Sequence, residues 1–143
     1  MLRTLPFAIL GWLITALGMY LNSYTDASTT GSYVAFTGII LFLFSFSIGM
    51  SSTPWTVNAE IYPLHVIGTA NSLSTTTNWL SNFVVATVFL IFLSTPLGSV
   101  LSFIVLAFFA GCAWFFVYLL LPETANHTID ENVAAILGKK YQE

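Results

Sequence analysis

Two long segments without any charged side chain restrict the possible folds of this chain more than any other feature. No Asp, Glu, Lys or Arg lies between Asp26 and Glu60, or between Glu60 and Glu123. Charged residues make up 6% of the 143 residues, whereas soluble domains carry about 25%. So few charges cannot cover the surface of a water-soluble globule, and we expect the uncharged segments to lie in a lipid bilayer.

The apolar segments are long enough for four membrane crossings, since one helical crossing needs about 20 mostly apolar residues. They cover residues 5–21, 33–59, 70–93 and 97–121. Helix is the expected state, because open strands would leave backbone groups unpaired in lipid and a membrane barrel would show an alternating pattern. We therefore predict an all-α membrane protein, with residues 1–121 as its membrane domain and residues 122–143 as a cytoplasmic tail.

The composition also excludes several functions. Three basic residues cannot form the positive surface that nucleic-acid binding requires. A single cysteine excludes a disulfide scaffold and a cysteine metal cage. His65 and His127 lie in polar connectors without a neighbouring catalytic or metal-binding pattern. We therefore expect no enzymatic activity, cofactor or metal site.

The few basic residues predict the orientation. Arg3 precedes the first span, and Lys139 and Lys140 follow the last, so the positive-inside rule places both termini and the connector 60–69 in the cytoplasm. The N-terminal run also has features of a secretory signal peptide. It is long for one and lacks a clear cleavage site, which favours a retained helix.

The third span carries a polar stripe. Asn71, Thr75, Asn78 and Asn82 recur at helical spacing and therefore share one face. Amides are costly in hydrocarbon unless they find partners or water. The stripe is expected either to face a wet cavity or to tie helices together, and the spacing alone does not choose between these alternatives.

The second span contains a helix-breaking segment. Pro54 follows Ser51 and Ser52, so we predict a discontinuous or bent helix with these residues as its hinge. Transporters place substrates at such broken helices. Trp55 and Asn58 are one turn apart and could contact one ligand. The alternative is that Trp55 is an interfacial tryptophan in a kinked helix.

Two further features concern the cytoplasmic side. Glu60 is expected either to pair with Arg3 or to remain a solvated surface carboxylate. In the tail, Thr128 and Glu131 fit a capping box at the start of a short amphipathic helix. This helix carries an apolar stripe of Ile129, Val133, Ile136 and Leu137.

Three motifs resemble the sugar porter family of the major facilitator superfamily. Residues 54–64 (Pro-Trp-Thr-Val-Asn-Ala-Glu-Ile-Tyr-Pro-Leu) resemble its tenth helix, most closely in the proton/myo-inositol symporter branch. Residues 78–83 (Asn-Trp-Leu-Ser-Asn-Phe) are similar to the eleventh helix. Residues 122–124 (Pro-Glu-Thr) match the start of the signature after the twelfth.

The resemblance implies that the chain corresponds to helices nine to twelve of a twelve-helix transporter. It implies substrate contacts for Trp55 and Asn82, with Asn78 beside the path. It also implies a cytoplasmic charge network of Arg3, Glu60 and Glu123. Among the departures from the family, Ser51 and Ser52 replace the usual Gly and Gly, Pro or Thr, Ile67 replaces an arginine, and Ala125-Asn126 replace Lys-Gly.

The resulting hypothesis is a partial transporter for a hexose or cyclic polyol that works by alternating access in the plasma membrane. It would act as a facilitator or a proton symporter, and would be inactive without the remaining N-terminal transporter helices. Its partners would be the small-molecule sugar or polyol, membrane lipid and, in a symporter, protons. The alternative is a stand-alone four-helix membrane scaffold that binds a partner protein and uses the asparagine stripe as an interface.

Overall fold

The computed structural model describes residues 2–26, 28–120 and 128–136. Within these residues the chain forms only helices. They are α1 (Leu5–Tyr24), α2 (Ser28–Gly49), α3 (Thr53–Glu60), α4 (Ile67–Phe92), α5 (Pro96–Leu120) and α6 (Ile129–Ile136). Four segments are long and apolar enough to cross a bilayer: α1, α4, α5 and the segment Ser28–Glu60, which contains both α2 and α3. The all-α membrane class is therefore confirmed.

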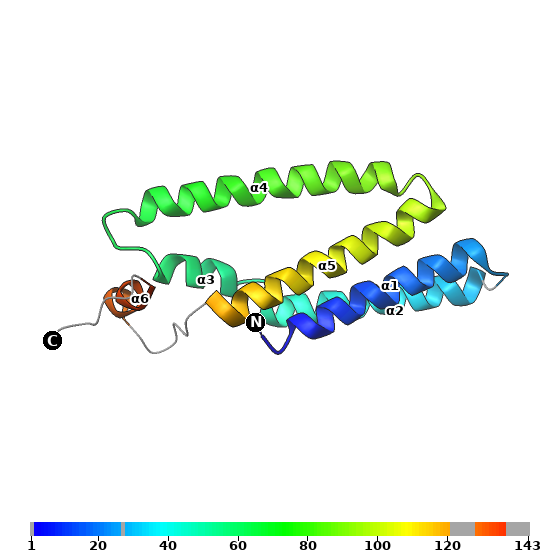
Figure 1. Ribbon diagram of the computed structural model, residues 1–143, viewed down its shortest axis with the longest axis horizontal. Coiled ribbons are helices and arrows are strands. Elements are labelled where there is room, and N and C mark those ends of the chain that lie inside the picture. Colours follow the sequence, from blue (N-terminus) through cyan, green and yellow to red (C-terminus); the bar gives the residue numbers. More distant parts are fainter. Residues whose placement is uncertain (1, 27, 121–127, 137–143) are drawn as a thin grey trace.

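The helices divide into a packed group and a helix that stands beside it. Figure 1 shows α1 lying along α2 and α5, while α4 approaches its neighbours near its two ends. No residue of α4 is buried. At the start of the chain, Trp114 Nε1 of α5 donates a hydrogen bond to the carbonyl oxygen of Leu2 at 3.1 Å. The core of the protein therefore lies between α1, α2 and α5.

The contact between α1 and α2 is built from small residues. Thr15 is fully buried, and its hydroxyl donates to the carbonyl oxygen of Gly11 at 2.8 Å. A Cβ atom at Gly11 would lie 2.7 Å from the backbone nitrogen of Phe42, and one at Gly38 would lie 2.5 Å from that of Thr15. One face of the first span is therefore covered by protein rather than by lipid, because small side chains allow the backbone of α2 to approach closely.

The turn between α1 and α2 is shorter than the predicted connector. α1 extends to Tyr24 and α2 begins at Ser28, before the apolar stretch that starts at residue 33. The close helix contact continues into this polar region, where a Cβ atom at Gly31 would lie 2.5 Å from the backbone nitrogen of Asn22. Packing between the helices, rather than hydrophobicity, therefore sets these helix ends.

The predicted capping box is present in the tail. The backbone nitrogen of Thr128 donates to Glu131 Oε2 at 2.6 Å, and that of Glu131 donates to Thr128 Oγ1 at 3.3 Å. These reciprocal bonds satisfy backbone donors at the start of α6. Asn132, one residue further on, is buried. Leu137, Lys139 and Lys140 lie outside the described residues.

Figure 1 places the helix ends in two groups. The end of α3, the start of α4 and α6 lie toward one end of the molecule, and α1 begins nearer its middle. The α1–α2 and α4–α5 turns lie at the other. This arrangement is the one expected when successive helices cross a bilayer in alternating directions. Which side is cytoplasmic stays a prediction.

Candidate functional site

The predicted interruption of the second span is present. α2 ends at Gly49, and the backbone nitrogen of Met50 still bonds to the carbonyl oxygen of Phe46 at 2.8 Å. The new helix starts with the bond from Thr56 N to the carbonyl oxygen of Ser52, at 3.1 Å. Pro54 lies in the first turn of α3, where its missing N–H leaves no helical bond unmade. The interruption is confirmed, whereas a hinge function for Ser51, Ser52 and Pro54 stays a prediction.

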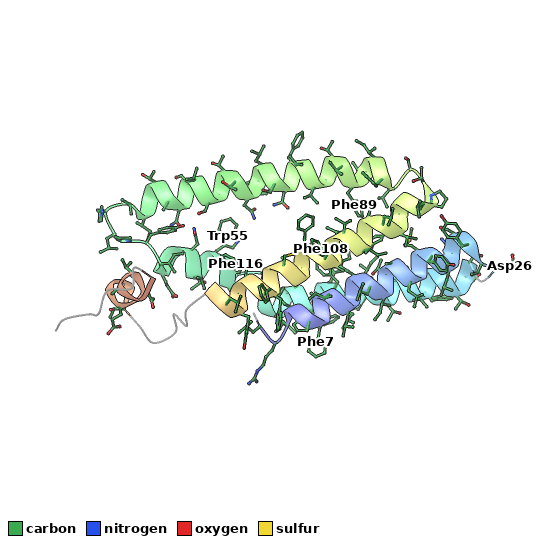
Figure 2. The ribbon with its side chains drawn as sticks, in the orientation of Figure 1. Phe7, Asp26, Trp55, Phe89, Phe108 and Phe116 are labelled. Carbon is green, nitrogen blue, oxygen red and sulfur yellow. The ribbon has the colours of Figure 1, made fainter. Side chains whose placement is uncertain are left out.

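Trp55 projects from the first turn of α3 into the space beside α4. Its side chain is 46% exposed. Figure 2 shows its ring on the side of α3 that faces α4, with Phe108 of α5 projecting toward the same side. Phe108 is 66% exposed. Two aromatic side chains from different helices therefore project toward the side on which α4 lies.

Asn58 joins α3 to α4. Its Nδ2 donates to Asn71 Oδ1 at 2.6 Å, and its Oδ1 accepts a hydrogen bond from Ser74 Oγ at 3.1 Å. All of these atoms are partly buried. Both ends of the Asn58 amide are thus engaged within the protein, and the first part of the stripe does tie helices together.

Two contacts fix the rotation of α4 about its axis. Asn71 bonds to α3, and Phe89 makes an edge-to-face contact with Phe103 of α5, with ring centroids 5.5 Å apart. Phe89 follows Asn71 by 89 − 71 = 18 residues, which is about five full helical turns, so both lie on one face. Asn78 and Asn82 lie between them on that face. The stripe is therefore directed toward α3 and α5, not away from the bundle.

Asn78 and Asn82 remain available to a ligand. Asn82 Nδ2 donates to Asn78 Oδ1 at 3.1 Å, and both residues are exposed. Within the described residues, the pair keeps one amide NH₂ group and one amide oxygen without a side-chain partner. Exchanging the assigned nitrogen and oxygen atoms in both amides preserves that combination. The pair can therefore donate to one polar group and accept from another.

An apolar groove continues from the polar part of the stripe. It lies between the C-terminal half of α4 and α5, with a cavity volume of about 310 Å³. Its walls include Val85 and Phe89 from α4 and Val105 and Phe109 from α5. The face of α4 that is directed toward α3 and α5 thus carries amide side chains near α3 and apolar side chains near the α4–α5 turn. The sequence motifs did not indicate this groove, because its residues resemble any lipid-facing side chain.

The predicted charge network is not assembled in the described residues. Arg3 is exposed and Glu60 is half-buried, and they form neither a hydrogen bond nor an ion pair with each other. Of the two alternatives for Glu60, this conformation shows a carboxylate that does not pair with Arg3, because α3 packs on α4 rather than on α1; the charge network itself stays a prediction. Glu123 lies outside the described residues. The described residues also contain no group of His, Cys, Asp and Glu that could hold a metal ion.

The chain is similar to known membrane transporters over most of its length. The family described as "Sugar (and other) transporter" matches residues 3–135. The proton myo-inositol cotransporter of Homo sapiens is 38% identical over 109 residues, covering 76% of this chain and 17% of that protein. Probable inositol transporter 3 of Arabidopsis thaliana is 37% identical over 99 residues, covering 69% of this chain and 17% of that protein.

Sugar transporter ERD6-like 7 of Arabidopsis thaliana is 31% identical over 128 residues, covering 90% of this chain and 27% of that protein. The chain therefore spans between 17% and 27% of the length of these relatives. No solved structure matches it.

Proposed function

The chain belongs to the sugar transporter family of the major facilitator superfamily, and we propose that it forms part of the substrate path of a transporter for a hexose or a cyclic polyol such as inositol. It is a multi-pass membrane protein, with four helices able to cross a bilayer. The family consists of transporters and not of enzymes.

The observation that supports the proposal is that Trp55 projects from α3 toward α4, while the face of α4 that carries Asn78 and Asn82 is directed toward α3 and α5. Each hydroxyl of a polyol can donate and accept a hydrogen bond, which suits an amide NH₂ group beside an amide oxygen. The C–H face of a sugar or inositol ring suits the flat face of Trp55. α4 and α5 contain no charged residue, which favours a neutral substrate.

Alternating access would use the interruption between α2 and α3. A short helix that is not continuous with α2 can tilt without breaking a regular hydrogen-bond ladder. Bending at residues 50–52 would move α3, and Trp55 with it, relative to α2. We propose that transport is coupled to protons, supported by the similarity to the human proton myo-inositol cotransporter.

The proposed substrate path would need more helices than the structure describes. Because the relatives are several times longer, we expect transport only when the remaining helices of such a transporter are present. We propose the plasma membrane as the location and the cytoplasm as the side of both termini. Arg3 before α1 supports this orientation by the positive-inside rule.

The proposal is tested by reconstituting the full-length product of the gene in liposomes. Uptake of labelled myo-inositol and glucose is measured with and without a proton gradient. Trp55→Ala is expected to raise KM by about ten-fold, which corresponds to the loss of about 1.4 kcal/mol of binding. Phe44→Ala is the matched control, because Phe44 is a 67% exposed aromatic residue in the same span, on α2.

The outcomes separate the two hypotheses. An unchanged KM for Trp55→Ala would remove Trp55 from the binding site. Absence of uptake for every hexose and polyol, together with a stable complex formed through the asparagine stripe, would support the scaffold alternative instead.

A further inference from the structure

Asn58 makes the only side-chain hydrogen bonds that join α3 to α4 within the described residues. It contacts two residues one turn apart on α4, Asn71 and Ser74, and so is held at two points. Hydrogen bonds between membrane helices fix their relative positions even where each contributes modestly to stability. We call Asn58, Asn71 and Ser74 the amide clamp.

The clamp lies next to the candidate site on both helices. Asn58 is one helical turn after Trp55, so the two side chains occupy neighbouring positions on α3. Asn71 belongs to the stripe that continues with Asn78 and Asn82. A rotation of α3 that displaced Asn58 from Asn71 would also turn Trp55 away from the stripe.

The N-terminal end of α3 is held more weakly than the part that carries Asn58. Residues 50–52 separate it from α2, and the side chains of Ser51 and Ser52 are exposed and make no hydrogen bond within the described residues. α3 buries no residue of its own. The interruption thus permits α3 to move relative to α2, while the clamp opposes its movement relative to α4.

We propose that Asn58 is a positioning residue, which fastens α3 to α4 through Asn71 and Ser74 so that Trp55 and the Asn78–Asn82 pair move together when the chain bends at residues 50–52. The inference rests on the proposed function, but it assigns Asn58 a different role from the one the sequence predicted. In this role Asn58 acts through α4 rather than by contacting the substrate, because its Nδ2 and Oδ1 atoms each bond to a side chain of α4.

The first test measures the clamp without transport. Spin labels are attached to the full-length protein at Thr56→Cys in α3 and Leu73→Cys in α4, both exposed positions, in a Cys112→Ser background. We expect a narrow distribution of label distances that broadens in Asn58→Ala and in Asn71→Ala. Ser72→Ala is the matched control, because the Ser72 hydroxyl bonds to Gly68 within α4. An unchanged distribution in Asn58→Ala would overturn the proposal.

The second test measures KM for uptake in the same variants. Asn58→Ala and Asn71→Ala are each expected to raise KM by about three-fold to about twenty-fold, the range covered by hydrogen bonds between membrane helices. The double variant should be no worse than Asn58→Ala alone, because that substitution already removes the hydrogen bond to Asn71. A loss of folded protein would lower the maximal rate and leave KM unchanged.

The results also distinguish this inference from the proposed function. If the label distances broaden but KM stays constant, Asn58 is a packing residue and its positioning role is wrong. If the effects of Asn58→Ala and Asn71→Ala on KM multiply, Asn58 contacts the substrate directly. If the unsubstituted protein takes up no hexose or polyol, the proposed function fails, and the label distances still decide whether the clamp exists.

Discussion

The backbone of Gly18 in α1 lies directly against Ala35 of α2. A Cβ atom added at Gly18 would overlap the backbone nitrogen and Cα of Ala35. Lipid provides no hydrophobic force between helices, so this contact depends on van der Waals packing at short range. The two helices can remain together only while the positions between their backbones stay small.

Gly18→Leu is expected to destabilise the protein by about 3 kcal/mol, because overpacking a tight contact forces the helices apart. The measurement is the unfolding midpoint in detergent. Gly111→Leu is the matched control, since a Cβ atom at Gly111 would meet nothing within 4 Å. Equal midpoints for the two variants would contradict the close α1–α2 contact.

The close contact between α1 and α2 also shows why the fold was only partly predictable from the sequence. Hydropathy identifies four crossings, because each is a long uncharged segment. It does not reveal that Gly11, Thr15 and Gly18 form a contact surface, since hydropathy is averaged along the whole span and does not separate one face from another. Their spacing on one helical face was visible in the sequence, but its significance depends on a matching face on α2.

The candidate site was likewise only partly predictable from the sequence. The interruption near Pro54 and the common face of Asn78 and Asn82 follow from residue chemistry and helical periodicity. The pairing of Asn58 with Asn71 depends on how the connector between α3 and α4 turns, which no local pattern specifies. The absence of an Arg3–Glu60 pair likewise depends on the direction in which α3 leaves the bundle.

Asn82→Ala is expected to raise KM for the polyol by about three-fold to about ten-fold, the cost of losing one neutral hydrogen bond. A substrate analogue that lacks the contacted hydroxyl should show the same increase with the unsubstituted protein, and no additional increase with the variant. Uptake kinetics with a series of deoxy analogues provide the measurement. Thr77→Val is the control, because the Thr77 hydroxyl bonds to Leu73 within α4.

Replacing Pro54 tests whether the interrupted helix must bend during transport. Proline costs about 3 kcal/mol in a helix interior, because it lacks the N–H group and its ring clashes with the preceding turn. Pro54→Ala removes that cost and favours a continuous helix through residues 50–52. We expect the maximal uptake rate to fall by about ten-fold while KM changes little, since the substitution opposes a conformational step and spares the substrate contacts.

Pro6→Ala is the matched control, because Pro6 lies in the first turn of α1, which begins a helix rather than interrupting one. Its maximal uptake rate should equal that of the unsubstituted protein. A rate for Pro54→Ala that also stays unchanged would show that bending at residues 50–52 does not limit transport. A large rise in KM would instead indicate that Pro54 acts through the position of Trp55, the residue that follows it.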